Sequence, residues 1–190
     1  MKARTSATHE VRIIGGLWKR TRLPVPDKAG LRPTPDRVRE TLFNWLGQDL
    51  RGWRCVDAFA GTGALGFEAA SRGATDVLLV EQDAQLVDLL RATQKKLEAS
   101  AVKVERGNGL SVLARLAPAS CNLVFLDPPF DADLWERALA SSASALAADG
   151  AIYLEAPVVW TDERLAPFGL ACARHMKAGT VHAHLLRRAA

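Results

Sequence analysis

The sequence predicts an α/β fold: a seven-stranded, mostly parallel sheet covered by helices on both faces, with a C-terminal antiparallel hairpin. Three observations lead to this prediction. Short apolar runs alternate with helix-like segments through the middle of the 190-residue chain. These runs are apolar almost without interruption, which is typical of strands buried on both faces. Near the C-terminus, two strand-like runs lie too close together for a crossover helix between them, which predicts an antiparallel pair.

The chain begins with a segment that is expected to form an arm. Gly15-Gly16, Pro24, Pro26 and Gly30 interrupt any helix there and favour a short hairpin or an irregular structure.

A helix is predicted to begin at Thr34. Its hydroxyl can serve as the N-cap, Pro35 is tolerated at the first helical position, and Asp36 suits the positive end of the helix dipole. Arg37 and Arg39 fall outside the apolar stripe, so we expect both to stay in contact with water. That stripe has helical spacing and consists of Val38, Leu42, Trp45 and Leu46.

The seven strands and their helices follow in order. The segments with the composition of strands are residues 54–59, 76–81, 103–106, 122–127, 151–155, 169–175 and 180–187. Helical stretches lie near 64–72, 84–99, 109–116 and 133–147. The last two strands are joined only by residues 176–179, which makes them the hairpin.

Composition restricts the class of protein. The apolar content of 48% and charged content of 24% are those of an ordinary globular domain. The first ten residues contain no apolar stretch, so they are not a secretory signal, and no run is long enough to cross a membrane. Cys55, Cys121 and Cys172 are odd in number and far apart. They indicate neither disulfides nor a metal cluster and favour a reducing, cytoplasmic setting.

Charge is unevenly distributed. Residues 1–40 contain ten Lys or Arg and four Asp or Glu, whereas the other residues contain 15 basic and 17 acidic groups. A basic arm on a nearly neutral body favours a polyanionic partner, most often nucleic acid. A solvated charged tail is the equally weighted alternative.

A glycine-rich loop follows the first strand. Residues 57–66 read Asp-Ala-Phe-Ala-Gly-Thr-Gly-Ala-Leu-Gly, a match to the G-x-G-x-x-G pattern that brings a ligand close to the backbone at a helix start. Glu81, at the end of the second strand, fits the ribose-binding acid of an NAD site. Asp57 favours a different cofactor, because its carboxylate repels a pyrophosphate but attracts the ammonium group of an amino acid. S-adenosylmethionine (SAM) has that group, no phosphate, and ribose hydroxyls for Glu81.

Asn108 follows the third strand in Gly107-Asn-Gly109 and can reach the edge of an adenine. A simple turn residue explains it equally well.

The most informative segment is Asp127-Pro128-Pro129-Phe130, at the end of the fourth strand. Each proline fixes its own φ and lacks an N–H, so the turn is stiff and extended. The Asp127 carboxylate and the carbonyls remain as acceptors, which suits binding the N–H groups of a planar amine. Phe130 offers a flat apolar face for a base. A strand terminator with a capping acid is the alternative.

Two other residue groups have simpler interpretations. His182 and His184 share a face of the last predicted strand, but no nearby Cys or carboxylate completes a metal site, so we predict none. Trp18 could stack on RNA because it lies between basic residues. Otherwise the scattered tryptophans are expected to pack in the core, namely Trp18, Trp53, Trp135 and Trp160.

Together these segments resemble the RsmD family of bacterial ribosomal RNA guanine-N2 methyltransferases, which have the Rossmann-like class I SAM-dependent fold. The resemblance covers roughly residues 11–187, and Leu31–Leu46 is its most diagnostic part. It departs from the family at Pro35, where a second Thr is expected, and is weak after residue 156. Its motifs are residues 12–16, 31–34, 36–40, 42–46, 57–66 and 127–130.

The resemblance implies roles for individual residues. Asp127 and the Pro128 carbonyl would hold the exocyclic amine of a guanine in small-subunit (16S) ribosomal RNA, and Phe130 would lie against the base. The residues that would line the SAM pocket are Asp57, Phe59, Gly61, Gly63, Glu81 and Asn108. Those that would meet RNA phosphates are Arg12, Arg32, Arg37 and Arg39.

The resemblance also implies a division of the chain and a partner. Residues 1–10 would be a disordered tail, residues 11–48 a basic, RNA-facing arm and helix, and residues 49–190 the SAM-dependent methyltransferase domain. The substrate would be an assembled or partly assembled ribosomal particle, and the protein a monomer.

Three alternatives remain at the level of sequence. The first is methylation of another amine, such as adenine N6 or a protein amide, for which Asn is more usual at position 127. The second is an NAD-dependent oxidoreductase, which leaves the Asp127 turn without a role. The third is a non-catalytic RNA-binding assembly factor, which does not require the acids at positions 57, 81 and 127.

Overall fold

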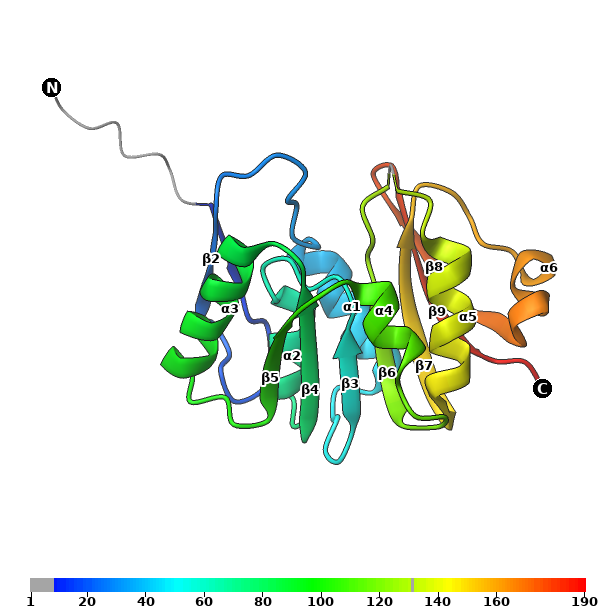
Figure 1. Cartoon of the computed structure of the whole chain (residues 1–190), viewed down its shortest axis with the longest axis horizontal. Helices are drawn as coiled ribbons and strands as arrows, with labels where there is room; N and C mark the ends of the chain where they lie inside the picture. The colour runs from blue at the N-terminus through cyan, green and yellow to red at the C-terminus, as the bar shows by residue number, and fades with distance from the viewer. Residues whose placement is uncertain (1–8, 131) are drawn as a thin grey trace, which may run out of the picture.

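A computed structural model describes residues 9–130 and 132–190. Seven strands form one sheet in the order β5-β4-β3-β6-β7-β9-β8, and two more form a separate hairpin (Figure 1). The sheet strands are β3 (Arg54–Asp57), β4 (Asp76–Glu81), β5 (Val102–Arg106), β6 (Cys121–Leu126), β7 (Leu146–Ala156), β8 (Leu170–Ala178) and β9 (Val181–Arg188). The hairpin is β1 (His9–Arg12) and β2 (Arg22–Val25). β3 to β7 are parallel, and β9 is antiparallel to both of its neighbours.

The predicted helices lie between the strands as expected, with ends shifted by a few residues, whereas a short helix and a 3₁₀ turn between β7 and β8 were not predicted. The helical elements are α1 (Asp36–Leu46), α2 (Ala64–Ser71), α3 (Ala84–Lys96), α4 (Gly109–Ala114), α5 (Trp135–Ala145), α6 (Asp162–Leu165) and the 3₁₀ turn η1 (Ala166–Phe168). No helix in the described part of the chain is long and apolar enough to span a membrane.

Alternation along the strands divides the apolar side chains between two cores. Phe125 of β6 and Tyr153 of β7 point to one face, whereas their neighbours Val124 and Leu154 point to the other. The central strands β6 and β7 therefore bury both faces, which explains their uninterrupted apolar runs in the sequence.

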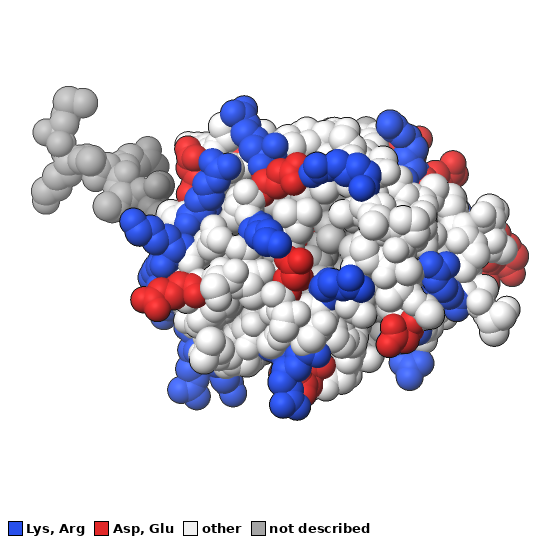
Figure 2. Space-filling model, turned by 60° about the horizontal axis from the view of Figure 1, so that its bottom comes forward, with Lys and Arg blue, Asp and Glu red and all other residues white. Residues whose placement is uncertain are grey.

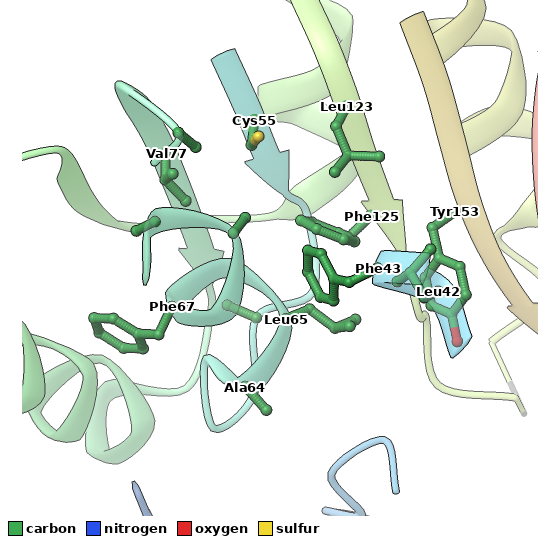
Figure 3. Close-up of a cluster of buried hydrophobic side chains, with 14 of the residues drawn as sticks. Leu42, Phe43, Cys55, Ala64, Leu65, Phe67, Val77, Leu123, Phe125 and Tyr153 are labelled. Atoms are coloured by element: carbon green, nitrogen blue, oxygen red, sulfur yellow. The ribbon is translucent and has the colours of Figure 1, made fainter. Parts of the chain in front are cut away.

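The first core joins α1, α2, α3 and the β1–β2 hairpin to the sheet. Figure 3 shows Leu42 and Phe43 of α1 and Leu65 of α2 packing towards Phe125 and Tyr153. The rings of Phe43 and Phe125 are 6.4 Å apart, and those of Phe125 and Tyr153 are 6.3 Å apart. The second core lies on the near face in Figure 1, under α4 and α5, and includes Trp135 and Trp160.

The C-terminal hairpin is confirmed, but its turn is tighter than predicted. β8 continues through the segment assigned to the link, and the turn consists of Gly179 and Thr180. Gly179 has a φ of +61°. Two-residue turns of this kind need a residue in the left-handed region, which glycine adopts without strain.

The arm forms the predicted hairpin and packs on the domain instead of standing apart from it. Val11, Ile13, Leu23 and Val25 are all buried in the first core. Residues 1–8 of the expected disordered tail lie outside the described residues. Its last two residues, His9 and Glu10, belong to β1.

The predicted N-cap is wrong. Pro35 occupies the N-cap position of α1 without a side-chain cap, and α1 begins at Asp36. The Thr34 hydroxyl instead donates a hydrogen bond to Oε1 of Glu155, 2.7 Å away and 121 residues later in sequence. The Thr34 hydroxyl therefore bonds to a residue distant in sequence, Glu155, and not to the backbone of α1 as the local sequence predicted.

The expectation that Arg39 stays in water is also wrong, because its side chain is fully buried. It pairs with Glu68 at 3.2 Å and with Asp36 at 2.5 Å, and it donates to the carbonyls of Arg12 and Thr34. The apolar stripe identified one buried side of α1. The hairpin covers a second side, and α2 supplies the carboxylate that makes an arginine acceptable there.

Replacement of Arg39 by leucine is expected to lower the free energy of unfolding by about 3 kcal/mol, because it leaves buried hydrogen-bonding groups without a partner. Arg37→Leu, on the exposed side of the same helix, is expected to change it by about 0.5 kcal/mol or less. Urea unfolding of the two variants tests this. Equal losses would contradict the structural role of Arg39.

Candidate active site

Four carboxylates gather where neighbouring parallel strands end. Asp57 ends β3, Glu81 ends β4, Asp127 follows β6 and Glu155 lies one residue from the end of β7. Their positions along the strands place all four on the face that carries α1 and α2. The carboxyl edge of an open α/β sheet is where such folds bind ligands.

Glu81 is held in place by the glycine loop. Its Oε2 accepts a hydrogen bond from the N–H of Gly61 and its Oε1 accepts one from the N–H of Asp83, both at 2.9 Å. Lys28 of the arm forms an ion pair with Asp83. These contacts fix the Glu81 carboxylate while leaving lone pairs for a diol.

The loop glycines are required by close packing. Gly61 and Gly63 have φ values of +54° and +79°, in the left-handed region. A Cβ on Gly66 would lie 2.1 Å from Cδ2 of Leu79, so only glycine lets α2 pack this closely on β4.

Asp57 is a buried carboxylate that lacks part of its hydrogen bonding. Its Oδ1 has no partner among the described residues. Burial raises the pKa of Asp57 to about 7, against the lowering effect of the backbone N–H groups of Gly66 and Phe59. A buried acceptor of this kind can hold a cationic group such as an ammonium.

Asn108 and Phe59 lie beside the loop. The Asn108 side chain is exposed and caps α4, accepting from the N–H of Ser111 at 3.2 Å. The amide group of Asn108 remains available for a second contact. Phe59 is half-buried, and a Cβ on Gly109 would lie 3.2 Å from its ring and 2.1 Å from the Ala58 carbonyl oxygen.

The Asp127 turn follows β6 and belongs to no helix or strand. Asp127 is half-buried, Pro128 is buried, and Phe130 is 39% exposed. The ring of Phe130 lies 5.9 Å from that of Trp135, at an angle of 50°. Trp135 thus packs against one part of Phe130, and the exposed part of the ring is accessible to a planar ligand.

Glu155 is the part of the site that sequence reasoning missed. It is 6% exposed, and its Oε1 accepts hydrogen bonds from Thr34 and from the Tyr153 hydroxyl, both at 2.7 Å. Trp135 Nε1 donates to its backbone carbonyl at 3.0 Å. The signal available in the sequence was an acid at the end of an apolar strand, the same signal that identified Asp57 and Glu81.

The edge is acidic and lacks a balancing cation. No lysine or arginine in residues 9–130 and 132–190 forms an ion pair with Asp57, Asp127 or Glu155. A pyrophosphate would have no positive partner there. SAM carries an ammonium and a positive sulfur, so the donor set fits SAM and not a dinucleotide.

The four arginines expected to meet RNA do not behave alike. Arg12, Arg32 and Arg37 are exposed, and Arg12 pairs with Asp36 at 2.6 Å. Arg39 is buried and already paired, so it cannot meet a phosphate. On the face shown in Figure 2, basic side chains are spread out among acidic ones and do not form an uninterrupted patch.

His184 and the tryptophans make packing and hydrogen-bonding contacts in the structure. His184 is buried, accepts from the N–H of Trp160 at 3.1 Å, and has its other nitrogen 3.3 Å from the Leu154 carbonyl. No group of three or more potential ligands among the described residues could hold a metal. The first core is contacted by Trp18 and Trp53, and the second core contains Trp135 and Trp160, as expected of packing residues.

Comparison with known proteins supports this assignment of the fold. Residues 11–187 match the family described as conserved hypothetical protein 95. Over 159 residues, the chain is 44% identical to ribosomal RNA small subunit methyltransferase D of Escherichia coli K12, covering 83% of this chain and 80% of that protein. The chain belongs to the RsmD family.

Solved structures agree with the RsmD assignment. A candidate methyltransferase from Escherichia coli, yhhF, has a TM-score of 0.82 and 40% identity, covering 96% of this chain and 99% of its own. A candidate methylase from Haemophilus influenzae has a TM-score of 0.78 and 32% identity, covering 96% and 100%. The predicted class I methyltransferase fold is confirmed, and the RsmD family and this fold imply SAM as the cofactor. The antiparallel β9 separates the sheet from the dinucleotide-binding order, so the NAD alternative is not supported.

Proposed function

We propose that this protein transfers a methyl group from SAM to the exocyclic N2 amine of a guanine in small-subunit ribosomal RNA. The observation that carries the proposal is the Asp127 turn, which presents open acceptors beside an exposed aromatic ring at the acidic carboxyl edge. The 44% identity to a small-subunit ribosomal RNA methyltransferase supports RNA as the substrate class.

Six residues at or beside this edge are assigned to the cofactor. Asp57 holds the ammonium group, Glu81 accepts hydrogen bonds from both ribose hydroxyls, and Asn108 meets the adenine. Phe59 and the backbone of Gly61 and Gly63 complete the wall. SAM supplies a methyl group that the positive sulfur has already activated.

Asp127 and the Pro128 carbonyl act on the amine. The N2 lone pair of guanine is delocalised into the ring, and accepting hydrogen bonds from both N–H groups draws the nitrogen towards tetrahedral geometry. The nitrogen held in this way would accept the methyl group that SAM supplies, and a carboxylate of the site would take the proton that the nitrogen loses. Since no covalent nucleophile is required, catalysis consists of positioning and electrostatics. Phe130 stacks on the extruded base.

The same site could accept a different amine, such as adenine N6 or a protein amide. The acid at position 127 favours guanine, because guanine offers N–H donors from both N1 and N2, whereas N1 of adenine is an acceptor.

The arm is assigned to RNA. Residues 11–48 form the RNA-facing part, with Arg12, Arg32 and Arg37 towards phosphates, and residues 49–190 form the methyltransferase domain. The proposed substrate is an assembled or partly assembled small subunit in the cytoplasm, and the enzyme acts as a monomer.

Loss of a phosphate contact is expected to weaken RNA binding and its dependence on salt. Arg32→Ala and Arg37→Ala should each raise the Kd for the substrate particle about three- to tenfold and reduce the slope of log K against log salt by about 1. Lys103→Ala is the control, because this exposed lysine is paired with Asp76 on β4. Equal effects of all three variants would contradict the proposed RNA surface.

The deciding experiment for the function uses small-subunit particles from cells that lack this protein. The particles are incubated with the protein and methyl-labelled SAM, and the RNA is digested to nucleosides. Labelled N2-methylguanosine is the expected product. Label on adenosine or on a ribosomal protein would show that the methylated group is the alternative amine and not guanine N2. Absence of label would reject the RNA substrate.

A further inference from the structure

Asp127 and Glu155 form a pair of carboxyl groups, of which only Asp127 has a role in the proposed methyl transfer. The register of β6 and β7 pairs Leu126 with Leu154, so the next residue on each strand lies beside the other. Adjacent strands are about 4.8 Å apart, and residues in register point to the same face. Asp127 and Glu155 therefore face α1 side by side.

Glu155 is held by donors that prefer its ionised form. Thr34 and Tyr153 both donate to Oε1, and they favour the carboxylate against the effect of burial, which raises the pKa of Glu155. Its Oε2 has no hydrogen-bond partner within the described residues. One oxygen is thus anchored, and the other is free to share a proton with a neighbour.

Within the part of the chain that the structure describes, no lysine or arginine forms an ion pair with Asp127 or Glu155. The groups that face the pair are Asp57 from β3, Tyr153 from β7 and Thr34 from the segment before α1. Burial and then the charges of Glu155 and Asp57 raise the pKa of Asp127 well above its ordinary value. Glu155 is buried and Asp127 is half-buried. Two adjacent carboxyl groups in such surroundings retain one proton between them.

We propose that Asp127 and Glu155 share one proton in the free protein, release it when a cofactor with a positively charged sulfur binds, and regain one from the methylated amine. Glu155 is in this scheme a positioning residue that acts through Asp127. The inference rests on the proposed function for the identity of the cofactor and for the role of Asp127.

Charge balance makes the scheme self-consistent. Before transfer, the ionised pair carries two negative charges opposite one positive sulfur. The new N2–carbon bond leaves the sulfur neutral, with the electron pair of the broken bond. The proton lost by N2 then returns the pair to one negative charge. The net charge of the enclosed site is therefore the same before and after the reaction, so no charge has to cross the protein during the transfer.

The test compares SAM with its demethylated product, S-adenosylhomocysteine, by calorimetric titration in buffers of different ionisation enthalpy. Both ligands carry the ammonium group, so proton release from Asp57 is common to both. Only SAM has the charged sulfur. At pH 7 the wild-type protein is expected to release about one proton more on binding SAM than on binding the product. Equal release for the two ligands would overturn the proposal.

Glu155→Gln removes the second carboxyl group while keeping hydrogen-bonding capacity for Thr34 and Tyr153. In this variant Asp127 has no second carboxyl group with which to share a proton, so the difference between the ligands is expected to vanish while release with the product persists. Glu136→Gln, an exposed site on α5, should keep the wild-type difference. A difference retained in Glu155→Gln would contradict sharing. If that variant does not fold, the wild-type comparison still decides.

These titrations contain no RNA, so they separate two failures. If the ligands release equal numbers of protons but N2-methylguanosine is formed, the sharing is wrong and the function stands. If the predicted difference is seen but RNA is not labelled, the pair is correct and the substrate is wrong.

Discussion

Replacement of Asp127 by alanine is expected to reduce single-turnover methyl transfer by more than about 10³-fold while SAM still binds. The alanine removes the acceptor for one N–H of the amine and the group that takes its proton. The binding residues for the cofactor, Asp57 and Glu81, lie on other strands and keep their contacts. Rapid-quench measurement with labelled SAM gives the rate, and calorimetry gives the affinity.

Asp127→Asn separates the two roles of this side chain. Its Oδ1 still accepts a hydrogen bond from the amine, but the amide cannot take a proton, so an intermediate loss of about 10²-fold is expected. Because Asp127 is a half-buried acid next to other carboxyl groups, its charge costs stability, and neither variant should unfold more easily than the wild type. Transfer by the alanine variant at the wild-type rate would rule out the proposed mechanism.

Replacement of Asp57 by asparagine is expected to weaken cofactor binding and to stabilise the free protein at the same time. Loss of the partner for a buried ammonium should raise the Kd for S-adenosylhomocysteine by about 30-fold or more. The same change removes a carboxylate that is buried without its full set of donors, which should raise the free energy of unfolding at pH 8 by about 1–3 kcal/mol.

The raised pKa of Asp57 determines how the contribution of this group to the free energy of unfolding changes with pH. The pKa of this group rises from 3.8 to about 7 on folding, so the folded state binds more protons than the unfolded state between these values. Stability from this group is therefore present at low pH and is lost as the pH rises towards 7. The asparagine variant should lack that loss. Affinity for S-adenosylhomocysteine should fall in the wild type below pH 7 and stay flat in the variant.

Two measurements check this prediction: urea unfolding at pH 5 and pH 8, and titration with S-adenosylhomocysteine over the same range. Asp76→Asn serves as control, since Asp76 is only half-buried at the opposite end of β4. Two results would contradict this prediction: wild-type affinity of Asp57→Asn for S-adenosylhomocysteine, or a lower free energy of unfolding of this variant than of the wild type at pH 8.

The order of strands and helices could be predicted from the sequence because each parallel strand is a short apolar run that ends in a distinctive residue. The same property revealed Asp57, Glu81 and Asp127, since the ends of parallel strands meet at one edge. The cofactor class followed from the sign of the charge at that edge.

The sequence could not reveal contacts between segments that are distant along the chain. Thr34 has the pattern of a helix cap, and only the tertiary structure brings it to Glu155. Arg39 lies outside the apolar stripe of α1, and its burial depends on a carboxylate from α2 and on the hairpin above it. Helical periodicity predicts which side of a helix packs on the core. It does not predict that another segment, here the β1–β2 hairpin, covers a second side.

The buried carboxylate of Glu68 has a consequence for the way the arm meets its partner. It accepts hydrogen bonds from the N–H groups of Ile14 and Gly15 at 2.8 Å, and it pairs with Arg39 and Arg72. The arm is thereby fixed to α1 and α2 before any partner arrives. Ordering a flexible segment costs about 1–2 kcal/mol per residue in conformational entropy. Because folding has already ordered this backbone, association with a polyanion needs to restrict only the exposed arginine side chains.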